Sequence, residues 1–253
     1  MAPKVYLITG ANRGIGLALV NELATNNSDI SIFAGVHNPL TATNLEGLSE
    51  KYPGKITIVK YISADEEGNK ALAKEIETKH GHLDVVIACA GIATYMGTAL
   101  ETPASELRDH LNVNVTGILV LFQSVYSLLK ASTSSPRFIP ISSAAASLTA
   151  FISLPAGYTC YGASKVAVNY IARKIHFEND WIICFPLAPG IVDTDMSRAN
   201  RVMDMTGTLA PIQDALAISA EKAATLLLGI IENATRENDG GEFINVDGQK
   251  LTW

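Results

Sequence analysis

A tyrosine and a lysine lie four residues apart in "YGASK", where Tyr161 and Lys165 fall in a stretch whose pattern predicts a helix. That spacing places both side chains on one helix face. Free tyrosine has a pKa of about 10, and a neighbouring ammonium favours the phenolate and lowers that pKa. A tyrosine tuned in this way would donate a proton to a carbonyl oxygen as a hydride reaches the carbonyl carbon.

Two serines end the strand that is predicted before this helix. Ser143 is expected to hydrogen-bond the same carbonyl oxygen and to polarise it. Side chains alternate along a strand, so only one of Ser142 and Ser143 can face a substrate, and the sequence leaves that choice open. Tyr158 is a rival proton donor, but Gly162 rather than a lysine follows it four residues later. The sequence therefore favours Tyr161 as the acid.

A glycine-rich turn, "TGANRGIG", follows the first predicted strand and opens the first predicted helix. Gly10, Gly14 and Gly16 permit a tight turn and a close approach of the backbone to a diphosphate, which free N–H groups at the helix start would bind. Arg13 lies in this turn, where its guanidinium would suit the 2′-phosphate of NADP. The second predicted strand ends near His37 without an Asp or Glu for the ribose hydroxyls of NAD. The turn predicts an NADP(H) site.

Strands and helices alternate along the whole chain. The predicted strands are "KVYLITG", "ISIFAGV", "KITIVKYI", "LDVVIACAG", "RFIPISS", "WIICFPLAPG" and "GEFINVDG". The predicted helices include 13–26, 68–81, 106–131, 161–179 and 219–234. This order predicts an α/β protein: a single-domain Rossmann fold over 1–253, doubly wound, with a seven-stranded parallel sheet and helices on both faces. Ligands of such sheets bind beyond the carboxyl ends of the strands.

Composition excludes several other classes of protein. The chain has 253 residues, of which 48% are hydrophobic, enough for one sizeable core. Its net charge is −6 and it has no basic stripe, so no nucleic-acid partner is expected. His80 and His82 fall in a predicted turn without partners, so no metal is expected. Sparse cysteines, no signal-peptide pattern and no apolar run near 20 residues favour a cytoplasmic protein with no membrane partner.

Several motifs occur together in a characteristic order: "TGANRGIG", "ACAG", "NVNVTG", "ISS", "YGASK" and "PGIVDT". In this order they resemble the short-chain dehydrogenase/reductase family over essentially the whole chain. Three further segments, "LDVVIACAGIA", "NYIARKIHFEN" and "GEFINVDGQKLTW", look like fungal norsolorinic acid ketoreductases and similar carbonyl reductases. The resemblance implies an NADP(H)-dependent carbonyl reductase.

The resemblance also implies roles for single residues. Tyr161 would be the general acid, Lys165 would bind the nicotinamide ribose, and Ser143 would orient the carbonyl. Asn114 would kink its helix and hold a water that links Lys165 to solvent. The segment from about 194 to 212, with its methionines, would be a mobile substrate lid. The implied cofactor-binding residues are Gly10, Asn12, Arg13, Gly14, Ile15, Gly16, His37, Ser63, Ala90, Gly91, Asn114, Tyr161, Lys165, Pro189, Gly190, Ile191 and Thr194.

The sequence departs from the family pattern at three places. Cys89 stands where the family commonly has an asparagine after the fourth strand, and Ile62 stands where an aspartate often lies near the adenine. The interval from Ser143 to Tyr161 is longer than usual. Its extra residues, around "TAFISLPAGYT", should sit at the substrate mouth, with Phe151 and Leu154 shaping an apolar pocket suited to an aromatic or polyketide ketone.

Three functions fit these observations. The leading hypothesis is an NADPH-dependent ketoreductase acting on a small-molecule ketone or aldehyde. A non-redox isomerase or cyclase on the same scaffold is an alternative, and a non-catalytic NADP(H) sensor is another. The set of Ser143, Tyr161 and Lys165 favours the reductase, because it serves proton delivery to a carbonyl. The long predicted helices 106–131 and 161–177 would suit a homodimer or homotetramer.

Overall fold

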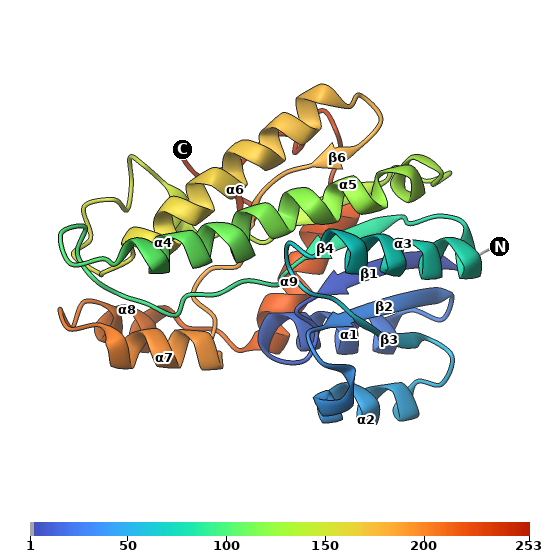
Figure 1. Ribbon diagram of the computed structural model, residues 1–253, viewed down its shortest axis with the longest axis horizontal. Coiled ribbons are helices and arrows are strands. Elements are labelled where there is room, and N and C mark those ends of the chain that lie inside the picture. The colour runs from blue at the N-terminus through green and yellow to red at the C-terminus, as the bar shows by residue number, and fades with distance from the viewer. Residues whose placement is uncertain (1–2) are drawn as a thin grey trace.

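The computed structural model describes residues 3–253, and its centre is a six-stranded parallel sheet (Figure 1). The strand order is β3-β2-β1-β4-β5-β6, so β1 and β4 are neighbours at the point where the order reverses. These strands are β1 (Lys4–Thr9), β2 (Ile30–Val36), β3 (Ile56–Lys60), β4 (Val85–Ala88), β5 (Arg137–Pro140) and β6 (Ile183–Cys184). In a doubly wound sheet such a reversal opens a crevice for ligands at the carboxyl ends of the strands.

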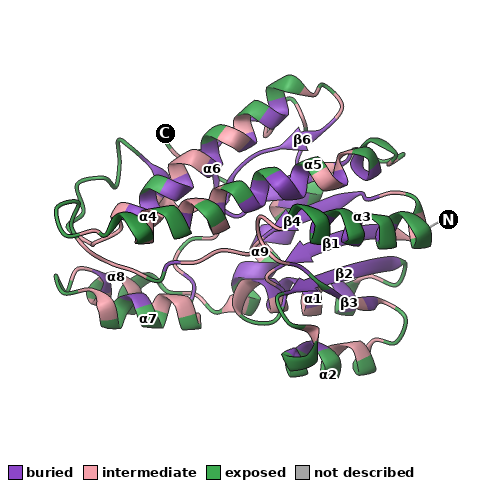
Figure 2. Cartoon of the chain, in the orientation of Figure 1, coloured by how far each residue is buried: buried purple, intermediate pink, exposed green. Residues whose placement is uncertain are grey.

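Helices cover both faces of the sheet, which confirms the predicted Rossmann architecture. One face carries α1 (Gly14–Asn26), α2 (Thr43–Lys51) and α9 (Ala220–Asn233), and the other carries α3 (Glu66–His80), α5 (Gly117–Lys130) and α6 (Thr159–Glu178). Figure 2 shows the strands as buried between these layers. The apolar residues of β2 and β4 are buried without alternation because both faces are covered.

The predicted seven-stranded sheet is wrong in one respect. The segment "WIICFPLAPG" forms two short strands, β6 and β7 (Leu187–Ala188), rather than one. Pro186 lies between them and has no N–H to donate to a ladder. The last strand, β8 (Ile244–Asn245), pairs with β7 in a separate two-stranded sheet. A single bridge between Ile141 and Leu187 keeps this pair beside β5.

The long helix predicted for 106–131 has three parts. It runs as α4 (Ala104–Leu111), a π-helical turn η2 (Asn112–Thr116) and α5. By length and composition, 104–130 is the one helix among residues 3–253 that could cross a bilayer, with a mean hydropathy of 1.4. It packs instead against the sheet core, with α5 beside α3 and α4 beside α6. It is therefore a core helix of the α/β fold.

Shorter elements surround the carboxyl edge of the sheet. The segment expected to be a lid forms α7 (Asp195–Met203) and part of α8 (Leu209–Leu216), which lie at the end of the molecule opposite the N-terminus (Figure 1). Two single 3-10 turns, η1 (Pro39–Thr41) and η3 (Ala144–Ala146), follow the ends of β2 and β5. Among residues 3–253, no group of three or more His, Cys, Asp or Glu side chains could hold a metal ion.

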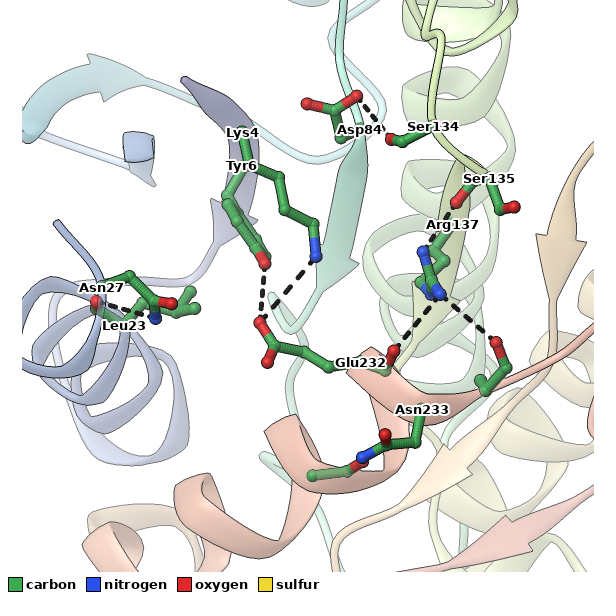
Figure 3. Close-up of polar contacts among 12 residues, drawn as sticks. Lys4, Tyr6, Leu23, Asn27, Asp84, Ser134, Ser135, Arg137, Glu232 and Asn233 are labelled. Carbon is green, nitrogen blue, oxygen red and sulfur yellow. Dashed lines mark hydrogen bonds and ion pairs between the residues drawn. The ribbon is translucent and has the colours of Figure 1, made fainter. Parts of the chain in front are cut away.

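A buried carboxylate joins the amino ends of β1 and β4. Asp84 Oδ2 accepts a 2.8 Å hydrogen bond from the Val5 backbone N–H, and its Oδ1 accepts a bond from the Ser132 hydroxyl. Oδ1 also accepts from the Ser134 hydroxyl (Figure 3). Burial alone would raise the pKa of Asp84, but these hydrogen bonds outweigh burial and hold it below its usual value. The amino edge of the sheet is thus fastened by polar contacts.

The same edge is tied to α9. The Tyr6 hydroxyl donates to Glu232 Oε1 at 2.9 Å, and the Arg137 guanidinium donates to the backbone oxygens of Glu232 and Ala234 (Figure 3). Burial is the main reason that the pKa of Tyr6 is raised, so its hydroxyl remains a donor. These contacts lie at the ends of the strands away from the predicted chemistry, which leaves the carboxyl edge free to form a site.

Candidate active site

The residues expected to bind a dinucleotide follow the carboxyl ends of neighbouring strands. Gly10 follows β1, Ala90 and Gly91 follow β4, and Pro189 and Gly190 follow β7. At the outer strands, His37 follows β2 and is exposed, and Ser63 follows β3 and packs against Gly117 at the start of α5. The fold therefore brings these residues to one edge of the sheet, with His37 and Ser63 at its far end.

The glycine turn has the geometry of a phosphate cradle. Gly10 and Gly14 have positive φ angles of 67° and 53°, which favour glycine. A Cβ on Gly16 would lie 2.3 Å from the Gly10 carbonyl oxygen, and one on Gly10 would lie 2.9 Å from the Ala90 Cα. Arg13 is the N-cap of α1 and makes no side-chain cap, so the first N–H groups of α1 are not covered by a side chain there. These residues fit the diphosphate of a nicotinamide dinucleotide.

Thr194 lies against the glycine turn. Its Cγ2 would be 3.3 Å from a Cβ on Gly14, and the residue caps α7 through a reciprocal box with Ser197. Gly190 has φ of 72°, and a Cβ there would meet Val246. Ile191 follows, and its carbonyl oxygen accepts from the Ile218 N–H. Asn12 is exposed and Ile15 is half-buried in the same turn.

Arg13 contacts the first turn of α7 rather than standing free. Its guanidinium lies 3.6 Å from Asp195 in the first turn of α7, and both side chains are more than half exposed. Arg198 pairs with Asp195 and also with Asp193. The pKa of Asp195 is lowered, first by its hydrogen bond to Arg198 and also by Arg13. Exposed pairs of this kind contribute little to stability, so Arg13 can turn to another anion at small cost.

Ser143 and Tyr161 meet at the carboxyl end of β5. Ser143 lies close enough to Tyr161 for its hydroxyl to lower the Tyr161 pKa, and that hydroxyl also accepts from the Ala145 N–H. The Ser142 hydroxyl points the other way and donates to Asn169 Oδ1 at 2.5 Å inside the core. The structure thus separates the two serines and puts Ser143 on the side of Tyr161.

The predicted effect of Lys165 on Tyr161 is wrong. The pKa of Tyr161 is raised, because burial outweighs the hydrogen bond from Ser143 that lowers it. Lys165 is itself buried, and desolvation lowers its pKa to about 8. Its ammonium nitrogen lies 5.5 Å from the centre of the Tyr161 ring and donates at 2.8 Å to the Ile141 carbonyl oxygen. Tyr161 is therefore a protonated phenol, ready to donate, rather than a phenolate.

Asn114 lies in the π-helical turn η2, which interrupts the helix as the resemblance implied. Its Oδ1 accepts from the Ile92 N–H at 2.8 Å, and its Nδ2 donates to the Ile92 carbonyl and to the Ser164 hydroxyl. Ser164 in turn donates to the Tyr161 backbone oxygen at 2.7 Å. Asn114 thereby fixes the loop after β4 against α6. The sequence analysis did not predict a role for Ser164, although its position between Tyr161 and Lys165 was a signal for one.

The two departures from the family pattern lie at this edge. The Cys89 thiol is half-buried, and desolvation raises its pKa to about 11 although a hydrogen bond from the Gly16 backbone lowers it. Cys89 thus lies next to the glycine turn with its thiol protonated. Ile62 is half-buried, and its backbone oxygen accepts from the Asp65 N–H and from Asn69. It presents no carboxylate to a ligand.

The substrate side is bounded by two loops and α7. The Gly97 N–H donates to the Gly157 oxygen at 2.9 Å, which joins the loop after β4 to the loop before α6. Phe151 and Leu154 in the extra segment are 39% and 43% exposed, so the apolar pocket predicted for them is not closed over their side chains. Asn200 of α7 reaches Tyr158, a contact that no sequence pattern indicated.

A hollow of about 470 Å³ lies beside the glycine turn. It is lined by both Gly14 and Thr194, together with residues of α1, α2, the first turn of α7 and the start of α9. Tyr161, Lys165 and Ser143 are not part of its wall. It therefore borders the diphosphate side of the candidate site, away from the proton donor.

Known proteins are similar to this chain over its full length. Residues 4–204 match the short chain dehydrogenase family. A norsolorinic acid ketoreductase of Aspergillus parasiticus is 34% identical, over 98% of this chain and 91% of the relative. The short chain dehydrogenase gsfK of Penicillium aethiopicum is 33% identical, over 99% and 100%. An NADPH-bound carbonyl reductase from chicken fatty liver superposes with a TM-score of 0.86 at 26% identity, over 100% of both chains.

Proposed function

The chain belongs to the short-chain dehydrogenase family and is an oxidoreductase of that family, and from this premise we propose that it reduces a ketone or aldehyde with NADPH. The observation that carries the proposal is the group at the end of β5, where the Ser143 hydroxyl lies against a half-buried, protonated Tyr161 and Lys165 lies beside the Tyr161 ring. A donor phenol next to a polarising hydroxyl is what carbonyl reduction requires of a protein.

Reduced nicotinamide, when bound, supplies the hydride for the carbonyl carbon. The glycine turn, Thr194 and the residues Pro189, Gly190 and Ile191 would hold the dinucleotide along the carboxyl edge. One N–H of Lys165 is used by Ile141, which leaves its other donors for ribose hydroxyls. Arg13 and the absence of an acid at the end of β2 support NADP(H) over NAD(H).

Tyr161 would then deliver the proton. Its raised pKa keeps the phenol protonated at neutral pH, so it can donate to the carbonyl oxygen as negative charge develops there. Ser143 would hydrogen-bond the same oxygen and stabilise that charge. Asn114 would act at a distance, by keeping the loop after β4 and the backbone of Tyr161 in place through Ser164.

We propose an aromatic or polyketide-type ketone as the substrate. Two kinds of support exist for this class. The norsolorinic acid ketoreductases of A. parasiticus and Dothistroma septosporum are 34% and 32% identical to this chain. The segment before α6 also presents Leu148, Phe151 and Ile152 with large exposed apolar surfaces, which suits a flat apolar molecule. We further propose cytoplasmic location and self-association through α5 and α6, where Leu119 and Phe177 are exposed.

Oxidation of NADPH, followed by its absorbance across a panel of aryl ketones, tests the proposal directly. We expect turnover with at least one ketone, formation of the matching alcohol, and no turnover by Tyr161→Phe. Conversion of a substrate without net oxidation of NADPH would favour the isomerase or cyclase. Tight NADPH binding without turnover of any carbonyl would favour the sensor.

A further inference from the structure

A second phenol lies beside Tyr161. The rings of Tyr158 and Tyr161 have centroids 5.5 Å apart and are tilted by 45°. The two side chains also affect each other electrostatically, because a negative charge on Tyr158 would raise the pKa of Tyr161. Burial raises the pKa of Tyr158 as well, so both hydroxyls keep their protons at neutral pH. Two neutral O–H donors thus stand side by side at the start of α6.

Asn200 of α7 holds the Tyr158 hydroxyl from the opposite side. Its Nδ2 donates to Tyr158 Oη at 3.4 Å. Asn200 is only 4% exposed, and its Oδ1 is buried without a partner among residues 3–253. Burying an amide with an unpaired oxygen is costly, and a leucine would pack at such a place without that cost. The polar contact that Asn200 does make is the one to Tyr158.

In this arrangement the O–H hydrogen of Tyr158 is not used in a hydrogen bond within the described part of the chain. A phenol oxygen that accepts from Asn200 still has its own O–H to donate. Tyr158 is half-buried rather than covered, and no residue in 3–253 accepts its proton within hydrogen-bond distance. The Tyr158 O–H therefore remains available to a molecule bound against Tyr161.

We infer that Tyr158, braced by Asn200, is a specificity-determining residue that binds a second oxygen of the substrate. The inference rests on the proposed reduction of a carbonyl held by Tyr161. Each donor holds its acceptor at about 2.8 Å, so two neighbouring phenols suit two ligand oxygens a few ångströms apart. Oxygens on a carbonyl carbon and on the carbon two positions away have such a spacing. The preferred substrate class is then a ketone with an acceptor oxygen on its β-carbon, such as a 1,3-dicarbonyl or an ortho-oxygenated aryl ketone.

A pair of isomeric ketones tests this role. 2′-Methoxyacetophenone carries its second oxygen on the β-carbon, whereas 4′-methoxyacetophenone carries it out of reach. We expect Tyr158→Phe to lower the ratio of kcat/KM for the first ketone over the second by about tenfold, the loss typical of one specific hydrogen bond. Asn200→Asp should lower the same ratio. A carboxylate only accepts hydrogen bonds, so the Tyr158 O–H would donate to it instead of to the substrate. Tyr170→Phe, an exposed tyrosine of the same helix, is the matched control and should leave the ratio unchanged.

A binding measurement separates this inference from the proposed reaction. 2-Methoxybenzamide and 4-methoxybenzamide have the same oxygens but no reducible ketone, so calorimetry on the protein with NADP⁺ reports recognition alone. The wild type should bind the 2-isomer more tightly, and Tyr158→Phe should remove the difference. An unchanged ratio of isomers in Tyr158→Phe, for ketones and amides alike, would overturn the inference and indicate that Tyr158 donates to Asn200 instead. Failure to reduce either ketone while the amide preference persists would overturn the reductase proposal and retain the second-oxygen site.

Discussion

The ammonium nitrogen of Lys165 donates a 2.8 Å hydrogen bond to the carbonyl oxygen of Ile141, the residue that follows β5. This bond fixes a buried cation below the ring of Tyr161 without a carboxylate to neutralise it. Desolvation therefore lowers the pKa of Lys165 to about 8, well below the usual value for lysine. The charge of this lysine depends on pH in a range where most lysines do not titrate.

The affinity for NADPH should follow that titration. A lysine with a lowered pKa loses its proton as the pH rises through about 8, and a neutral amine holds ribose hydroxyls less well than an ammonium does. We expect the Kd for NADPH to rise above pH 8 by up to about tenfold per pH unit. Fluorescence titrations with NADPH between pH 6.5 and 9.5 measure this Kd. Lys165→Arg stays charged throughout and should show no such rise; a parallel rise in that variant contradicts the assignment.

Ser142 and Ser143 form a matched pair for mutagenesis. Ser143→Ala removes the hydroxyl that contacts Tyr161, and we expect kcat to fall by about 10²-fold with a small change in stability. Ser142→Ala removes a buried bond to Asn169, and we expect a loss of about 1–2 kcal/mol in the free energy of unfolding with kcat retained. Steady-state kinetics and urea unfolding of both variants test these expectations. A loss of kcat in Ser142→Ala and a loss of stability in Ser143→Ala would assign the catalytic contact to Ser142.

Arg13 should set the choice of cofactor. Because its pair with Asp195 is exposed and weak, the guanidinium is free to bind a 2′-phosphate. We expect Arg13→Ala to weaken NADPH binding by about 10- to 100-fold, the range for a charged hydrogen bond, and to leave NADH binding unchanged. Arg198→Ala is the control, since Arg198 contacts the same Asp195 from within α7. An equal loss for both cofactors in Arg13→Ala would refute the assignment.

Asp84 should stabilise the sheet in a pH-dependent way. Asp84→Ala leaves the Val5 N–H and two serine hydroxyls without their acceptor, and we expect a loss of about 2–3 kcal/mol in urea unfolding at pH 7. The folded pKa of Asp84 is below its unfolded value, so this contribution is complete above about pH 4 and disappears as the pH falls through the folded pKa. The difference between wild type and variant should therefore shrink in acid, and a difference that grows there would contradict the sign.

Ala64 occupies a backbone conformation that suits glycine. Its φ is 62°, in a turn closed by the Asp65 N–H on the Ile62 oxygen, at the end of β3. We expect Ala64→Gly to raise the free energy of unfolding by about 0.5–1 kcal/mol, because it relieves the left-handed strain. Ala71→Gly, at an exposed position inside α3, should lower it by a similar amount. Destabilisation by both changes would show that strain at Ala64 is negligible.

The sequence predicted the sheet and the phosphate-binding glycine turn because both features depend on patterns of neighbouring residues. Continuous apolar runs mark strands covered on both faces. The glycines at 10 and 16 are required by close backbone contacts, and the glycine at 14 is favoured by its positive φ. Helix α2 was missed because only Leu45 among its residues is buried, so it has little apolar periodicity. The split between β6 and β7 was missed although Pro186 marked it.

The properties of the site were harder to predict than its residues. The spacing of Tyr161 and Lys165 gives a shared face, but the sign of the pKa shift of Tyr161 depends on how deeply the fold buries both groups. The contact between Asn200 and Tyr158 joins segments 42 residues apart, and no local pattern encodes it. Burial and long-range contacts are properties of the assembled fold, so they follow only from the coordinates.

The π-helical turn at 112–116 also sets the phase between the two halves of the long helix. A π turn accommodates one more residue than an α turn, and each residue advances a helix by about 100°. The extra residue lets α5 present its apolar side to the sheet while α4 directs His110 to the Thr94 N–H, where Nε2 accepts at 3.3 Å. Removal of one residue would rotate these halves out of alignment, so this stretch tolerates substitutions far better than a change in length.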